Sequence, residues 1–366
     1  MWINVLLALG LYFSASFVAV ASENPHSLPT PKLIAKFNHP NVWRLNWSGD
    51  EQYLVSAGLE PVPIFFSQVR IEPTVAIWSL KTKRLVKAHF RPGPRSIALL
   101  VGDEPQAIGI HSKAPNWERS VSFSVWNAHT GALSKHVHSQ PSLVDTAAEA
   151  GGELLHYSYS HARRLLAVTR SLEKRVYVYD INTWNIVAER GASRDIGKLA
   201  FSRDGSRIAF NQGIYILIWN LETNRVELEI EAFERVSGVY CWLAGDRHIA
   251  ALRAQGSRSV SPRGPEYDTD LSIWDVKTGL LTQSFPGRFG GAITHDEASI
   301  GCGNEKNYIA TLTMDRVARV WSIQTGTVAH AIDTKLADSP GLSVSPIQNW
   351  LALSGADGVS IYSLEK

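Results

Sequence analysis

Cysteine is scarce in this chain: two of 366 residues are cysteines, and they form no Cys-x-x-Cys pair. That absence excludes the zinc and dithiol motifs that such pairs build. A surplus of one charge is also missing, because 36 lysines and arginines nearly balance 34 aspartates and glutamates. This balance argues against the basic footprint of a nucleic-acid-binding protein. The chain also lacks the Gly-x-Ser-x-Gly elbow of serine hydrolases and a phosphate-cradling glycine loop.

Long hydrophobic runs are absent after residue 21, so no membrane span is expected in the mature chain. From Val5 to Ala21 the chain is uncharged and mostly apolar, and it ends in the small-x-small pattern Ala19-Val20-Ala21. This pattern predicts a signal peptide over residues 1–21, a Pro-rich linker over 22–31, and an exported, periplasmic or extracellular protein that begins at Ser22. An uncleaved anchor and a cytosolic chain are the alternatives, because residues 1–4 carry no lysine or arginine.

The dominant feature that is present is an apolar hexapeptide with a central aromatic residue, which occurs seven times at separations of 40 to 55 residues. Such a period, built on short strands and turns, is typical of a β-propeller with one four-stranded blade per repeat. We therefore interpret the recurring aromatic residues as packing residues of the blades. They are Trp78, Trp126, Tyr179, Trp219, Trp274, Trp321 and Tyr362.

The residues around each aromatic support this interpretation. A threonine stands four residues after each of the first six aromatics, and three of these threonines precede a glycine. Threonine and glycine are suited to the tight turn between two strands. The chain ends after the third strand of its seventh unit, and residues 32–39 resemble the missing fourth strand. The sequence thus predicts a single all-β domain over residues 32–366, a seven-bladed propeller of four-stranded antiparallel blades whose N-terminal strand completes the last blade.

This arrangement resembles the WD-repeat family of seven-bladed β-propellers, with its YVTN and quinoprotein-like relatives. Trp274-Asp275 is a literal Trp-Asp pair, and Tyr179-Asp180 is a near match. No Gly-His dipeptide occurs, so the buried His–Asp hydrogen-bond network typical of the family is not expected in its usual form. Three aspartates stand near the aspartate position of that network: Asp268, Asp315 and Asp357.

Three long connections between the second and third strands, residues 58–74, 111–121 and 254–270, are the candidate binding site. Because they occur at the same step of the repeat, they are expected on one face of the disc, and insertions in repeat proteins commonly collect on the binding face. They contain aromatic and arginine residues of the types enriched in interfaces. The candidates are Phe65, Phe66, Arg70, Trp117, Arg119, Arg258, Arg263 and Tyr267. The alternative is that Phe65 and Phe66 fold back as a plug over the blade.

Two classes of function remain open. The first is a non-catalytic scaffold, expected to be a monomer without cofactor or metal, whose protein partner binds the face with the long connections. The second is an extracytoplasmic enzyme or enzyme subunit, because the resemblance includes lactonases and partners of quinone-containing dehydrogenases. A channel that binds a small carbohydrate or peptide is a third hypothesis. Carboxylates or histidines converging at the channel mouth would favour an enzyme, whereas we interpret His156 and His161 as structural.

Cys241 and Cys302 differ by one position on the inner strands of neighbouring blades, so their side chains face either toward or away from each other. A disulfide and a pair of buried thiols are both compatible with this placement. The prediction favours free thiols that pack as small apolar residues.

Overall fold

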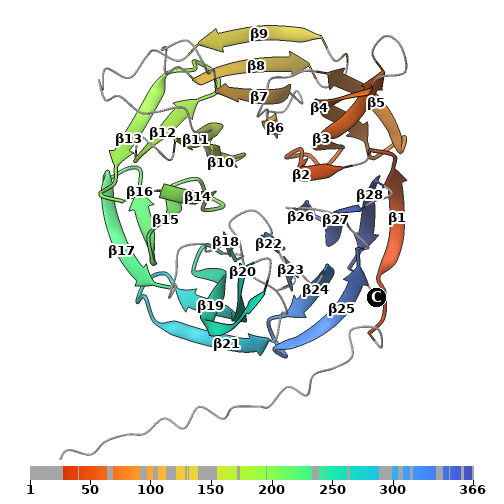
Figure 1. Ribbon diagram of the computed structural model, residues 1–366. Coiled ribbons are helices and arrows are strands. Elements are labelled where there is room, and N and C mark those ends of the chain that lie inside the picture. The colour runs from red at the N-terminus through yellow and green to blue at the C-terminus, as the bar shows by residue number, and fades with distance from the viewer. Residues whose placement is uncertain are drawn as a thin grey trace, which may run out of the picture.

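The chain forms a ring of seven four-stranded antiparallel sheets (Figure 1), which confirms the predicted fold. The inner strands line a cavity at the centre of the ring, which we call the central channel. The computed structural model describes residues 28–364, except for residues 40, 64–68, 91–96, 102–105, 113–120, 128–129, 131, 139–154, 171–173, 195, 233–238, 244, 262–263, 288–298, 304–307, 314–315, 335–340, 346 and 356–357. Within this part of the chain, no helix is long and apolar enough to cross a membrane.

The blades follow one another along the chain, and each begins at the channel and ends at the rim. Blade 1 contains β2 (Val42–Trp47), β3 (Tyr53–Pro63), β4 (Val69–Ser79) and β5 (Arg84–Phe90). Blade 2 contains β6 (Ile97–Val101), β7 (Gln106–Ser112), β8 (Val121–Asn127) and β9 (Leu133–His138). Blade 3 contains β10 (Leu155–Ser160), β11 (Leu165–Arg170), β12 (Arg175–Asp180) and β13 (Ile186–Gly191). Blade 4 contains β14 (Ile196–Phe201), β15 (Arg207–Gln212), β16 (Tyr215–Asn220) and β17 (Arg225–Glu231).

The remaining strands form three further blades. Blade 5 contains β18 (Val239–Trp242), β19 (His248–Ser261), β20 (Gly264–Asp275) and β21 (Leu281–Gly287). Blade 6 contains β22 (Ser299–Cys302), β23 (Tyr308–Leu312), β24 (Val317–Ser322) and β25 (Thr327–Asp333). Blade 7 contains β26 (Leu342–Val344), β27 (Trp350–Gly355), β28 (Gly358–Ser363) and, as its outer strand, β1 (Lys32–Phe37) from the start of the chain.

The ring is closed by β1, as predicted. This strand pairs antiparallel with β28 from Lys32↔Ser363 to Phe37↔Val359. Beyond that pairing, the ring of Phe37 stacks on the indole of Trp78 in blade 1, with the ring centroids 4.8 Å apart. The first strand therefore joins blade 7 to blade 1, and it pairs the edge of β28 that would otherwise be exposed.

A turn-to-turn contact strengthens the same junction. The buried carboxylate of Glu51, in the β2–β3 turn, accepts hydrogen bonds from the Ser345 hydroxyl and from the backbone N–H groups of Ile347 (2.6 Å) and Gln348 (2.9 Å). Asp246, at the same turn position of blade 5, accepts from two backbone N–H groups in the corresponding turn of blade 4. Both acids stabilise the neighbouring blade by satisfying turn donors that the sheets leave unpaired.

The hydrophobic core lies between the blades. Each hydrophobic cluster among the described residues joins two neighbouring blades, as Ile108 and Phe123 of blade 2 do with Leu166 and Tyr179 of blade 3. The third strand of a blade is therefore buried on both faces, whereas the outer strand is largely exposed. Six of the seven motif aromatics are at most 8% exposed, and Tyr362 is half-buried against blade 6.

The recurring threonine has a defined place in the turn between the third and fourth strands. The backbone N–H of Thr223 donates to Asn220 Oδ1, and those of Thr183 and Thr278 donate to aspartates at the same position. The residue after the threonine has a positive φ in every such turn that the structure describes, which explains the glycines at 279 and 326. These bonds are Asx turns, and they fix the hairpin that begins each outer strand.

One buried hydrogen-bond chain crosses from the closing strand into blade 1. The indole N–H of Trp78 donates to Ser56 Oγ (2.7 Å), and His39 Nδ1 lies 2.6 Å from the same oxygen. His39 and Ser56 are both 0% exposed. Blade 6 has a shorter version, in which Trp321 Nε1 donates to Thr311 Oγ1 (2.9 Å). The missing Gly-His dipeptide therefore does not prevent a histidine from reaching the motif tryptophan of blade 1.

We expect His39 to make the folded ring sensitive to acid. Burial lowers the pKa of this imidazole to about 4, whereas an unfolded histidine titrates near pH ~6.5. Between these two pH values the unfolded chain binds a proton at this histidine and the folded chain does not. The free energy of unfolding is therefore highest above pH ~6.5 and decreases by about 3 kcal/mol as the pH falls to 4. Urea unfolding of the wild type and of His39→Gln from pH 7 to 4.5 measures this. Equal pH slopes for the two proteins would contradict the assignment.

Candidate functional site

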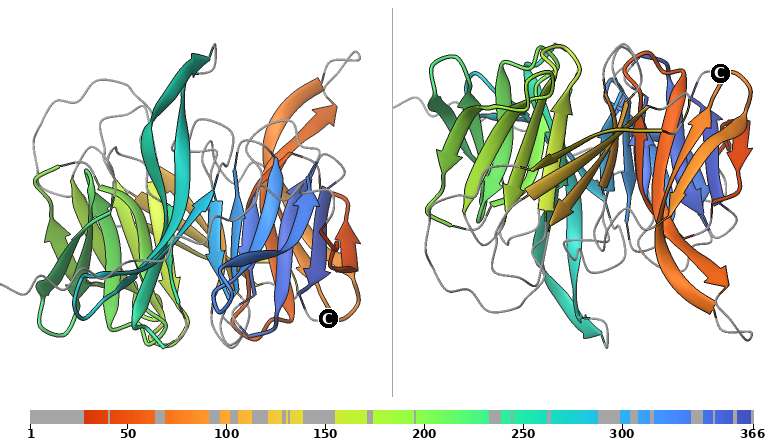
Figure 2. Two further views of the ribbon diagram at one scale, coloured as in Figure 1. Left: turned by 90° about the horizontal axis from the view of Figure 1, so that it is seen from below. Right: turned by 90° about the horizontal axis from the view of Figure 1, so that it is seen from above.

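Two pairs of strands extend beyond the ring. In blade 1, β3 and β4 continue to pair from Gly58↔Thr74 out to Pro63↔Val69. In blade 5, β19 and β20 pair from Ala254↔Thr269 out to Ser261↔Gly264, with two register shifts on the way. We call these hairpins the blade 1 arm (residues 58–74) and the blade 5 arm (residues 254–270). Figure 2 shows them in orange and in teal, leaving the disc on the same face.

The prediction that these connections share one face is confirmed for the two arms, but the prediction that they are loops is wrong. Each is a β-hairpin whose backbone pairing continues that of the blade. Each arm stands clear of the disc in Figure 2, so its strands have no neighbouring sheet there. Unpaired strand edges are surfaces that can accept another strand.

The predicted binding residues fall on these segments. Arg70 lies on β4, and Arg258 and Tyr267 lie on β19 and β20, so the fold brings these three positions onto the two arms. The remaining candidates belong to segments outside the described residues; they are Phe65, Phe66, Trp117, Arg119 and Arg263.

The second candidate site is the central channel, where a cavity of about 340 Å³ is lined by the inner strands of blades 1, 3, 4, 6 and 7 and by Tyr240 of blade 5. Its polar side chains include Arg44, Lys198, His156 and His161, and no aspartate or glutamate is among the described residues that line it. A cavity of this size suits a small organic molecule. His156 and His161, which the sequence analysis interpreted as structural, both line this cavity.

Hydrogen bonds between blades hold the channel wall. Asn46 Nδ2 donates to the Tyr157 hydroxyl (3.1 Å), which links blade 1 to blade 3. Burial raises the pKa of the Tyr157 phenol, while the nearby Arg44 and the bond from Asn46 act in the opposite direction. Tyr157 is therefore a neutral phenol at physiological pH.

The next blades are joined in the same way. The Tyr240 hydroxyl donates to the Lys198 carbonyl, and burial raises the pKa of this phenol well above its usual value. Trp242 Nε1 donates to the Ala200 carbonyl (2.9 Å), and the Phe201 N–H donates to Ser158 Oγ (3.0 Å). Blades 3, 4 and 5 therefore share a connected and rigid inner wall.

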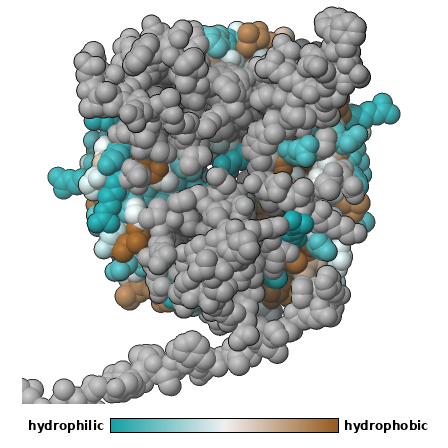
Figure 3. Space-filling view, viewed as in Figure 1, coloured by the Kyte–Doolittle hydropathy of each residue, from teal (hydrophilic) through white to brown (hydrophobic). Residues whose placement is uncertain are grey.

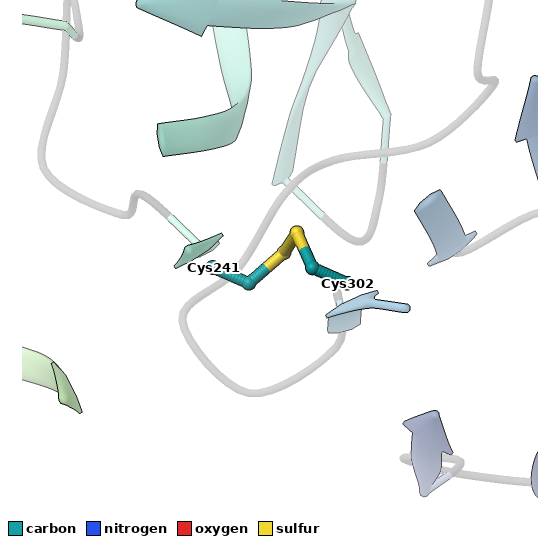
Figure 4. The surroundings of a disulfide bond; sticks show 2 residues. All are labelled: Cys241 and Cys302. Carbon is teal, nitrogen blue, oxygen red and sulfur yellow. A yellow bond between two sulfur atoms is a disulfide. The ribbon is translucent and has the colours of Figure 1, made fainter. Parts of the chain in front are cut away.

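A disulfide closes the wall between blades 5 and 6 (Figure 4). Cys241 on β18 and Cys302 on β22 are bonded, with their Cα atoms 5.8 Å apart. The favoured prediction of two free thiols is therefore wrong. The one-position offset between the two strands points the side chains toward each other, which is the alternative that the sequence had left open.

The described residues of the outer surface form no comparable site. Exposed hydrophobic side chains such as Leu133 (59%) and Leu280 (67%) lie at or near the start of separate outer strands. In Figure 3, hydrophobic residues of the described part are scattered among hydrophilic ones around the rim. No group of three or more His, Cys, Asp or Glu side chains within the described ranges is placed to hold a metal ion.

Comparison of the chain with models of known protein families and with curated proteins gives no match.

Proposed function

We propose that this protein is an exported, non-catalytic interaction module whose protein partner binds the face that carries the blade 1 and blade 5 arms. The observation that supports the proposal most strongly is the pair of hairpins that leave the ring on one face (Figure 2). The hydrophobic clusters of the described residues lie within the disc, whereas Figure 2 shows the two arms outside it. The arms therefore serve contacts outside the ring.

The chemistry of the arms fits a protein partner. Their sequences contain arginines and aromatic residues, the residue types enriched where interfaces are most tightly bound. Their free strand edges can add a strand from a partner by β-augmentation, in which main-chain hydrogen bonds supply affinity. Two arms on one face can also hold a partner from two sides, so each arm need contribute only part of the affinity.

We further propose that the ring is a divergent member of the WD-repeat propellers. The His39–Ser56–Trp78 chain supports this, because it links a buried histidine at the blade junction to the motif tryptophan. The Asx turn at Asp275, directly after Trp274, supports it as well.

Export is supported by the Cys241–Cys302 disulfide. Disulfides persist in oxidising compartments and are rare where thioredoxin and glutathione keep thiols reduced. The apolar segment over residues 1–21 provides the matching signal.

Trimming both arms is expected to abolish partner binding while leaving the ring folded. Gly58 would be joined to Thr74, and Ala254 to Thr269, by Asn-Gly turns, since these residues already pair across the strands. We expect wild-type protein to retain a defined set of proteins from the extracytoplasmic fraction, as measured by quantitative mass spectrometry, and the trimmed protein to lose them.

A matched control replaces three exposed residues in the turns on the opposite face, Lys81, Asn182 and Glu222, with alanine. This variant should retain the same proteins as the wild type. Retention by the trimmed protein at wild-type levels, with an unchanged melting curve, would show that the arms are not the binding face.

A further inference from the structure

The inner strands can be compared position by position through their pairing partners. In blades 1, 3 and 6, one residue of the inner strand pairs with the first buried residue of the second strand; these pairs are Trp47↔Leu54, Tyr159↔Leu166 and Cys302↔Ile309. Three residues before this reference position stand Arg44, His156 and Ser299, respectively. Lys198 of blade 4 stands three residues before Phe201, which pairs with Ile208, and it lies where the register of β14 shifts between Ile196 and Leu199. Arg44 and His156 therefore lie at one level of the ring, and Lys198 lines the same cavity. We call these three positions the basic level of the channel.

Successive strand residues point to opposite sides, so the position two residues further along faces the channel as well. There the chain places Asn46, Ser158 and Ser343, which carry small hydrogen-bonding groups and line the same cavity. The channel thus has a basic level with a polar, uncharged level next to it. The alternate positions pack between blades, as the buried Trp47 and Trp242 do.

The electrostatics of this level favour an anion. Arg44, His156 and Lys198 are all half-buried, and no carboxylate is among the described residues that line the cavity. Partial burial weakens the screening by water, so each cation attracts an anion more strongly than on an open surface. Arginine and lysine are also the side chains best suited to carboxylate and phosphate oxygens.

We propose that the central channel is a binding site for a small organic oxyanion, held by Arg44 and Lys198 and oriented by hydrogen bonds from Asn46 and Ser158. The wall around the site is preorganised by the Asn46–Tyr157 bond and the links from Tyr240 and Trp242 to blade 4, so binding requires little ordering. The site is separate from the two arms and does not depend on their function.

Calorimetric titration with citrate and with inorganic phosphate, at an ionic strength held constant with sodium chloride, tests the proposal. We expect saturable binding of at least one of these probes, with a Kd below about 1 mM. Arg44→Gln and Lys198→Gln should each weaken it at least about tenfold, because each removes one cation from a partly desolvated site.

Two variants on outer strands, Arg225→Gln and Lys135→Gln, make the same chemical changes on exposed side chains and should bind as the wild type does. Thermal melts establish that all four variants are folded. The proposal is overturned if neither probe binds saturably, or if the channel and outer-strand variants bind equally well. Trimming the arms should not change this titration. Failure of the proposed partner binding and failure of the proposed anion site can therefore be told apart.

Discussion

Deletion of residues 32–39 is expected to unfold the ring under conditions in which deletion of residues 22–30 leaves it folded. The first deletion removes β1, exposes the edge of β28, and empties the space that Phe37 fills against Trp78. Loss of a buried phenylalanine alone costs about 3–5 kcal/mol. The second deletion removes a proline-rich segment whose described contact is the hydrogen bond between His330 Nδ1 and the Pro29 carbonyl (2.8 Å), worth about 1 kcal/mol.

A single substitution tests the same closure without shortening the chain. Gly358 begins β28 with φ of 109°, and a Cβ atom there would lie 2.1 Å from the carbonyl oxygen of Phe37. Gly358→Ala is therefore expected to cost about 3 kcal/mol or more, since it combines backbone strain with a clash against the closing strand. Gly191→Ala is the control, because no atom lies within 4 Å of the new methyl group.

Both comparisons are made by thermal and denaturant unfolding of the purified protein. Equal stability of the two deletion variants, together with equal stability of the two glycine variants, would show that β1 does not close the ring.

The second large effect is expected at the disulfide. Replacing Cys241 and Cys302 with alanine should destabilise the protein by about 4 kcal/mol, because the bond closes a loop with a sequence separation of 61 residues and restricts the unfolded chain. Urea unfolding of the oxidised wild type and of the double variant measures the difference. Adding a reductant should bring the wild type close to the variant and leave the variant unchanged.

Thiol titration in denaturant without reductant provides the chemical check. The oxidised protein should contain no free thiol, since its two cysteines are bonded to each other. Two titratable thiols in the freshly purified protein would contradict the bond and would remove the support that it gives to the proposed export.

The ring could be predicted from the sequence because its core repeats. Each blade packs an aromatic residue of its third strand against a neighbouring blade, as Trp219 does, and the following turn needs the same hydrogen bonds, as at Thr223. The aromatic residue and the threonine therefore recur at matching positions. The closing strand was predictable as well, since a ring that ends after three strands of its last blade lacks its outer strand.

The arms were harder to predict. Their strands leave the disc, where the described hydrophobic clusters impose a repeating pattern, so the sequence of residues 58–74 and 254–270 does not distinguish a paired hairpin from a loop. The side-chain direction at Cys241 and Cys302 depends on how two neighbouring inner strands are offset, which is a property of the assembled ring.

The sequence analysis did not predict the basic residues of the channel or the His39 chain, for a related reason. Arg44 and Lys198 are separated by more than 150 residues, with His156 between them, and only the closed ring brings all three to one cavity. The prediction relied on the Gly-His dipeptide of the family, whereas His39 follows Asn38 and contacts Ser56 from the junction between β1 and β2. A comparison of the inner strands aligned on Trp47, Tyr159 and Phe201 would have revealed the basic level.

The central claim is that the chain forms one closed ring in which the first strand belongs to the last blade. Native-state hydrogen exchange of the full-length protein, resolved by peptide, measures this directly. The amides of Lys32–Phe37 that pair with β28 should exchange as slowly as those of Gly358–Ser363, and the two sets should be released together as denaturant is added. Exchange of residues 32–37 as fast as that of the preceding residues 28–31, with β28 still protected, would contradict the closed ring.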